Sequence, residues 1–79
     1  MRYLKTFFEE KEIQEQEFEV TGRQGETHFI STNVVIEAIL NAPENEQQKI
    51  AATIRKIDFK NGDIVDYLRH LAKGLAMNY

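Results

Sequence analysis

The spacing of hydrophobic positions changes along the chain, and each change predicts a different element. Near the N-terminus, Leu4, Phe7 and Phe8 recur at the spacing of one helix face, so we predict a short helix over residues 3–11. Residues 15–21 alternate between apolar and polar side chains instead, which is the pattern of a half-buried strand.

A turn and a second strand are predicted after this segment. Residues 22–25, Gly-Arg-Gln-Gly, carry the glycines of a hairpin turn. With the two middle residues as the turn centre, Phe18 lies opposite Phe29 and Glu19 lies opposite His28. We therefore predict an antiparallel hairpin with Phe18 and Phe29 on one buried face, which helices must cover because two strands are not stable alone.

Local signals place the next two helices. The run Ser31-Thr32-Asn33 offers three N-cap candidates before an apolar helix over residues 33–41. Pro43 suits the first turn of a following helix, where its missing N–H has no cost. The inner stripe predicted for this helix consists of Ile50, Ile54 and Ile57.

The last helix is predicted over residues 64–77, after a turn at Asn61-Gly62. Its apolar line consists of Ile64, Leu68, Leu71 and Leu75. Further apolar residues flank this line, so the helix either presents a contact surface or lies buried on two sides within one monomer. The contact surface would consist of Tyr67, Leu71, Leu75 and Met77. Helix 33–41 would support it, because its polar face is nearly limited to Glu37.

The composition fits an α+β arrangement. The chain has 79 residues, of which 42% are hydrophobic and 29% charged, an ordinary globular mixture. We predict a single compact domain of the order αββααα: an N-terminal helix, a two-stranded antiparallel hairpin and three helices. The absence of cysteine excludes disulfides and thiolate chemistry and fits a reducing compartment. No apolar stretch approaches the roughly 18 residues of a membrane span, so we expect a soluble, cytoplasmic protein with no membrane partner.

Charge is divided unevenly along the chain. Residues 1–48 carry four basic and ten acidic side chains, net −6, whereas residues 49–79 carry six basic and three acidic ones, net +3. The basic half suggests an alternative nucleic-acid face. This face would consist of Lys49, Arg55, Lys56, Lys60 and Lys73. Against it, Glu44 and Glu46 would lie at the helix end that phosphates approach, and the pI of about 5.3 is acidic.

Groups that carry chemistry are few and scattered. One strand face holds an acidic ladder of Glu15, Glu17 and Glu19. Neighbours on such a face stand about 7 Å apart, and no ligand loop accompanies them, so we expect a charged face that resists aggregation. His28 and His70 would need carboxylates, and Glu19 and Asp66 are the nearest in the pattern. We expect no catalytic residue, no metal site and no cofactor.

Together these features predict a small non-enzymatic protein of bacterial type that acts through protein–protein contact, with a homodimer as its expected form. Self-association suits so short a chain, since conformational entropy offsets most of what a small core supplies. Nucleic-acid binding is the alternative. A small hydrolytic or metal-dependent enzyme that uses the two histidines is the third hypothesis.

Overall fold

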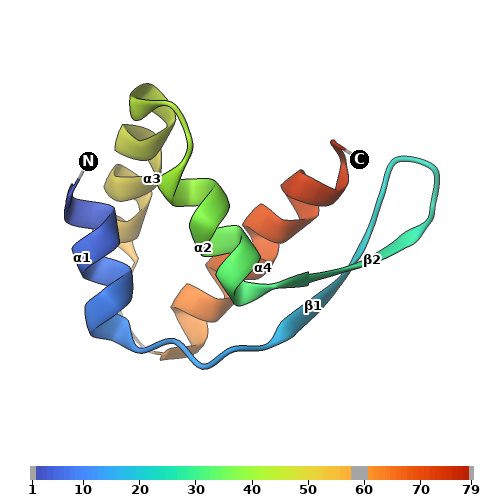
Figure 1. Cartoon of the computed structure of the whole chain (residues 1–79), viewed down its shortest axis with the longest axis horizontal. Helices are drawn as coiled ribbons and strands as arrows, with labels where there is room; N and C mark the ends of the chain where they lie inside the picture. The colour runs from blue at the N-terminus through green and yellow to red at the C-terminus, as the bar shows by residue number, and fades with distance from the viewer. Residues whose placement is uncertain (1, 58–60, 79) are drawn as a thin grey trace.

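A bundle of helices lies at one end of the molecule, and a two-stranded hairpin extends from it (Figure 1). The computed structural model describes residues 2–57 and 61–78. Its elements are α1 (Arg2–Lys11), β1 (Glu17–Thr21), β2 (Thr27–Ser31), α2 (Thr32–Leu40), α3 (Glu44–Lys56) and α4 (Asn61–Ala76). The predicted αββααα order is therefore confirmed, although α4 begins inside the segment that was predicted as a turn.

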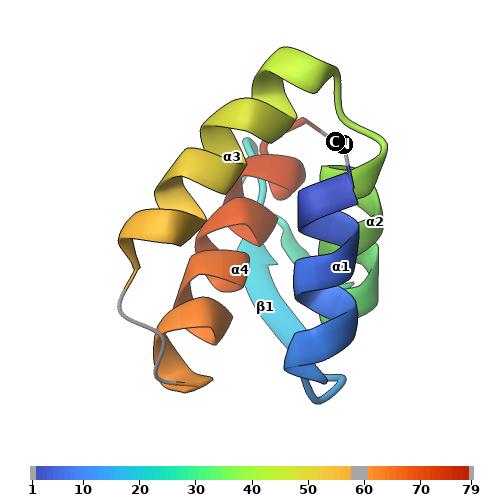
Figure 2. The same ribbon diagram turned by 90° about the vertical axis from the view of Figure 1, so that its left-hand side faces the viewer.

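The core lies where the helices meet the inner face of the hairpin. α2 and α4 pack against both the hairpin and each other, while α1 and α3 pack beside α2. Figure 2 shows the helices side by side in front of β1. The buried apolar residues are Leu4, Phe8, Phe18, Val20, Ile30, Val35, Ile39, Ala51, Ile54, Ile64, Leu68, Ala72 and Ala76. Every element thus contributes to one core.

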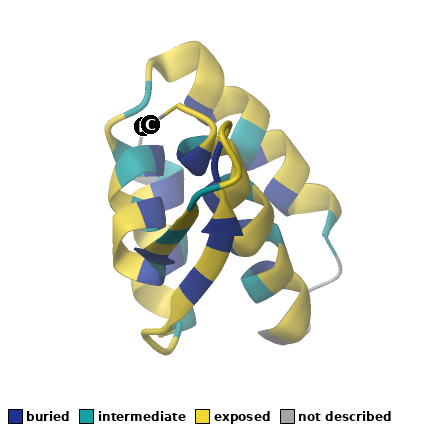
Figure 3. Cartoon of the chain, turned by 90° about the vertical axis from the view of Figure 1, so that its right-hand side faces the viewer, coloured by how far each residue is buried: buried dark blue, intermediate teal, exposed yellow. Residues whose placement is uncertain are grey.

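The strand register differs by one residue from the predicted one. Phe18 pairs with Ile30, and Phe29 pairs with Glu19. Because side chains alternate between the two faces of a strand, this shift turns Phe29 outward, where 65% of it is exposed. The predicted buried pair of Phe18 and Phe29 is therefore wrong, and Ile30 takes the inner position. Figure 3 shows the alternation of buried and exposed residues along the hairpin.

The length of the hairpin loop explains the shift. The N–H of Gly22 donates to the carbonyl of Glu26 at 2.8 Å, and the N–H of Gly25 donates to the carbonyl of Gly22 at 3.2 Å. Gly25 has a φ of +81°, in the left-handed region. A turn followed by a left-handed glycine is the three-residue hairpin loop, one residue longer than the predicted two-residue turn.

This loop makes Gly25 sensitive to substitution. Gly25→Ala is expected to lower the free energy of unfolding by about 1–2 kcal/mol, because a Cβ is strained at this φ. Gly62→Ala is the matched control: it lies in the first turn of α4, where an added Cβ meets nothing within 4 Å, so it should stabilise the fold by up to about 1 kcal/mol. Chemical denaturation followed by circular dichroism measures both. Equal effects of the two substitutions would contradict the loop assignment.

The N-terminus of α2 is tied to the base of the hairpin. As predicted for a cap, the Ser31 hydroxyl accepts from the N–H of Val34 at 3.2 Å. The buried hydroxyl of Thr32 donates to the Glu15 carboxylate at 2.7 Å and accepts from the N–H of Gln16 at 3.2 Å. The N–H of Thr32 donates to the carbonyl of Gln16 at 2.9 Å. Glu15 therefore caps a helix end instead of extending an acidic ladder.

The C-terminus of α2 is held by α3. The side-chain amide of Gln47 donates to the carbonyls of Leu40 and Ala42, at 3.1 and 2.9 Å. Pro43 directly precedes the first residue of α3, close to its predicted place. The buried stripe of α3 consists of Gln47, Ala51 and Ile54. Ile50 and Ile57, predicted for that stripe, are half-buried.

Candidate protein-contact groove

The fully buried line of α4 is not the predicted line of large residues. It consists of Ile64, Leu68, Ala72 and Ala76, which recur every four residues. Leu71 and Leu75 lie on the neighbouring face and are half-buried. Small alanines on the buried line let the second half of α4 pack closely against the core. The two leucines are left partly accessible at its side.

These two leucines line an open groove between α2, α3 and α4, with a volume of about 460 Å³. The lining residues are Val35, Ala38, Ile39, Ala42, Glu46, Ile50, Leu71, Gly74, Leu75 and Asn78. Eight of these ten residues are apolar or glycine. Because apolar surface in contact with water is unfavourable, such a groove favours contact with an apolar side chain of another molecule.

The predicted contact surface is only partly one site. Leu71 and Leu75 line the groove together with residues of α2, so the structure brings the two predicted helices to one place. Tyr67 shares their helix face at the spacing i, i+4, i+8 but does not line the groove. Its hydroxyl lies by Thr53 of α3: burial raises the pKa of Tyr67, and the hydrogen bond with Thr53 acts in the opposite direction. Met77 is 46% exposed and lies outside the groove wall.

The contribution of α3 to the groove was not predicted. Glu46 and Ile50 come from this helix, while Gly74 of α4 and Asn78 in the turn after α4 complete the wall. The one sequence feature that pointed to a contribution from α3 was the apolar stripe to which Ile50 belongs. Among the lining residues, all of which the structure describes, only Glu46 is charged, and its carboxylate lies 3.7 Å from the ammonium of Lys49.

The cations of the predicted nucleic-acid face occupy different surroundings. Lys49 is paired with Glu46, and the guanidinium carbon of Arg55 lies 4.4 Å from the centre of the Tyr3 ring on α1. Lys56 ends α3, and Lys73 lies in the last turn of α4. Lys60 lies outside the described residues. Nucleic-acid binding stays a prediction, without a geometric feature that adds to it.

The two histidines do not meet the carboxylates predicted for them. The register places Val20, not Glu19, opposite His28, and the Nε2 atom of His28 lies 3.2 Å from the Glu26 carboxylate instead. Hydrogen bonds from its own backbone N–H, then from His28 and from the N–H of Gln24, lower the pKa of Glu26, while desolvation opposes them. His70 is exposed on α4.

Asp66, the predicted neighbour of His70, instead binds Arg69 at 2.8 Å. Within residues 2–57 and 61–78, no three histidine, aspartate or glutamate side chains gather closely enough to hold a metal ion. The Glu26–His28 pair is thus a local contact of the hairpin. An alanine at Gly22 would collide with it, since an added Cβ meets the Glu26 carboxylate.

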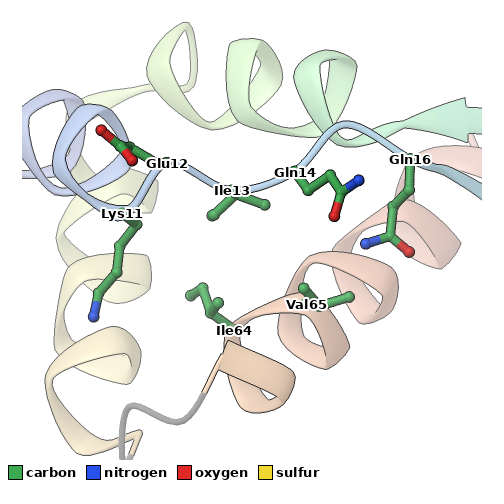
Figure 4. A pocket seen from close by; sticks show the side chains of 7 residues that line it. All are labelled: Lys11, Glu12, Ile13, Gln14, Gln16, Ile64 and Val65. Atoms are coloured by element: carbon green, nitrogen blue, oxygen red, sulfur yellow. The ribbon is translucent and has the colours of Figure 1, made fainter.

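A second hollow lies between the α1–β1 connection and the start of α4, with a volume of about 300 Å³ (Figure 4). Ile13 faces Ile64 across it, while Lys11 and Glu12 point away from each other. Glu12 has a φ of +49°, which re-aims the chain after α1. Four of its seven lining residues are polar or charged, so the more apolar α2–α3–α4 groove is the stronger candidate for a protein contact.

No helix formed by the described residues has the length and apolarity to cross a lipid bilayer. Comparison with protein-family models, with curated proteins and with solved structures finds no match to this chain. The function proposed for this chain therefore rests on the geometry of the groove.

Proposed function

We propose that this chain is a small non-enzymatic protein that acts through protein–protein contact, and that a second copy of the chain binds at the groove. One observation carries the proposal. The half-buried Leu71 and Leu75 form one wall of an apolar groove, and the exposed Met77 follows directly after the end of the same helix, outside the groove. The C-terminal end of α4 thus provides both an apolar groove and an apolar side chain that fits such a groove.

Two copies of the chain can each place an apolar side chain in the groove of the other. In a two-fold contact, residue i of one copy touches residue j of the other, and j touches i. Met77 of each copy then enters the groove of its partner beside Gly74, whose missing side chain permits close approach of the two helices. The unbranched side chain of methionine adapts to an irregular cavity, which suits this role.

The electrostatics of the groove are compatible with a second copy. Glu46 is the charged member of the wall, and Lys49 already accompanies it. Lys49 partly offsets the charge of Glu46, which weakens like-charge repulsion between two copies at the wall. The association is driven by burial of apolar area, at roughly 25 cal/mol per Å² before the costs of association are subtracted.

Substitution of Met77 tests this contact. Met77→Glu is expected to raise the dissociation constant for self-association at least tenfold, a loss of about 1.4 kcal/mol or more, because a carboxylate would enter an apolar groove. Light scattering coupled to size-exclusion chromatography over a range of concentrations measures this dissociation constant. The control is Val34→Glu on α2, since Val34 is exposed to nearly the same extent, 44% against 46%, and does not line the groove.

Because both side chains are exposed, neither substitution should disturb folding, which circular dichroism checks. A Met77→Glu protein that keeps the solution mass of the wild type at every concentration would refute the groove as a self-contact. Equal weakening by Met77→Glu and Val34→Glu would also refute it, since added negative charge alone would then be the cause.

A further inference from the structure

The two-stranded hairpin has one outer edge along β1 and another along β2, and the two edges differ in the charge of their side chains. In an antiparallel ladder, pairs that exchange hydrogen bonds alternate with pairs that do not. Hydrogen bonds join Gly22 to Glu26 at one end of the ladder and Gln16 to Thr32 at the other. By alternation, the N–H and C=O groups of Phe29 point away from β1, toward the open edge of β2.

The two edges are not equally protected against pairing with another strand. β1 carries Glu17 and Glu19 on its outward face, and charged side chains discourage a second strand. β2, with the sequence Thr-His-Phe-Ile-Ser, carries no acidic or lysine side chain. Within the part of the chain that the structure describes, β2 pairs with β1 and with no other strand. The outer edge of β2 is therefore less protected than that of β1 against pairing with another strand.

Phe29 is the second feature that points to a partner at this edge. It is 65% exposed, the highest value among the large hydrophobic residues described as exposed. Its neighbour across the ladder is Glu19, which offers it no apolar contact. Exposed aromatic side chains of this kind are typical of contact surfaces, and an aromatic pair across two strands adds stability.

We propose that β2 pairs antiparallel with β2 of a second copy, about a two-fold axis at Phe29. In this register Phe29 lies opposite Phe29 of the other copy, and Thr27 lies opposite Ser31. The outward backbone groups of Phe29 are then satisfied reciprocally, and the two hairpins form one four-stranded sheet. Pairing through β1 would instead place the Glu17 and Glu19 side chains of both copies together, which is unfavourable.

This contact is separate from the groove and does not depend on the proposed function. The groove is formed by α2, α3 and α4, whereas the edge belongs to β2 alone. If the two contacts have different two-fold axes, a chain that uses both surfaces forms assemblies of at least four copies. Each surface can therefore be removed by itself, and the remaining one leaves a dimer.

A set of four proteins tests the proposal: the wild type, Phe29→Glu, Met77→Glu and the double variant. Light scattering is expected to give at least four copies for the wild type, two for each single variant and one for the double variant. Val34→Glu again controls for added charge. A Phe29→Glu protein with the mass of the wild type would overturn the edge contact, whereas failure of Met77→Glu alone would overturn only the groove.

Amide hydrogen exchange gives a second measurement that does not rely on a substitution. The amide of Phe29 should exchange at least tenfold more slowly at a concentration where the protein is associated than at one where it is dissociated. The outward amide of Glu19 on β1 should change little and serves as the internal control. Unchanged exchange at Phe29 in the associated protein would overturn the pairing, because its N–H would then remain open to water.

Discussion

Leu68→Ala is expected to lower the free energy of unfolding by about 2–5 kcal/mol, because it leaves a cavity that the surrounding core fills only in part. Leu68 is completely buried at the middle of α4 and is one of the largest such side chains. A domain of this size has a total stability of about 4–12 kcal/mol, so the variant is expected to be largely or partly unfolded near physiological temperature. Thermal and urea denaturation followed by circular dichroism measure the loss.

Leu71→Ala is the matched control for this prediction. Leu71→Ala removes the same atoms from α4 as Leu68→Ala, one helical turn further on. Leu71, however, is half-buried and borders an open groove. Its loss should be clearly smaller, since water can reach the vacated space. Equal losses at the two positions would show that Leu71 is as enclosed as Leu68 and would contradict the groove described here.

Thr32→Val is expected to lower the free energy of unfolding by about 1–2 kcal/mol, although it preserves the shape of the side chain. The substitution removes the acceptor of the Gln16 N–H and the donor to the Glu15 carboxylate. A buried donor that loses its partner costs about 1–3 kcal/mol, and hydrogen bonds to charged groups are stronger than neutral ones. Thr32 is 1% exposed, but Glu15 and Gln16 are exposed, so water replaces part of what their groups lose. Urea denaturation measures the difference.

Two further substitutions separate the hydroxyl from the rest of the side chain. Thr32→Ser keeps the oxygen and should recover most of the lost stability. Thr21→Val removes an exposed hydroxyl of β1, and should change the stability by less than about 0.5 kcal/mol. If Thr32→Val were as mild as Thr21→Val, the link between the hairpin and α2 would not contribute to stability.

The helices could be predicted from the sequence, but the residues on their buried faces could not all be. Helical periodicity located α4, and Ile64 and Leu68 lie in its buried line as predicted. Ala72 and Ala76 complete that line in place of two leucines. Pattern analysis follows the large apolar residues, whereas close packing of helices selects small ones. The size of a side chain therefore did not indicate how deeply it is buried.

The hairpin shows a different limit. Alternation correctly placed Phe18 and Val20 on the buried face of β1. The partner strand depended on the loop, and Gly25 in the left-handed region adds one residue to it. That single residue turned Phe29 outward and moved Glu19 away from His28. Both turn lengths fit the glycines at 22 and 25, so the sequence alone did not decide the register.

The complete groove could not be predicted from the sequence, because it depends on how α2, α3 and α4 cross. Leu71, Leu75 and the helix now described as α2 were predicted as contact surfaces, and the structure brings them together. The part contributed by α3 depends on the path of the chain after Pro43, which hydrophobic periodicity does not describe. The polar links of Thr32 and Gln47 were missed because they join side chains to polar groups across the bends between elements, which hydrophobic periodicity does not describe either.

The link at the base of the hairpin also bears on the order in which the chain folds. The bond from the Gln16 N–H to Thr32 closes a segment of only 16 residues, and short closures cost little entropy. Residues 15–40 can therefore gather by local contacts, which favours rapid folding. We therefore expect the hairpin and α2 to form one cooperative folding unit, onto which α1, α3 and α4 assemble. Residues 15–40 carry five acidic side chains and one basic side chain, so this unit would attract the basic residues of the C-terminal half.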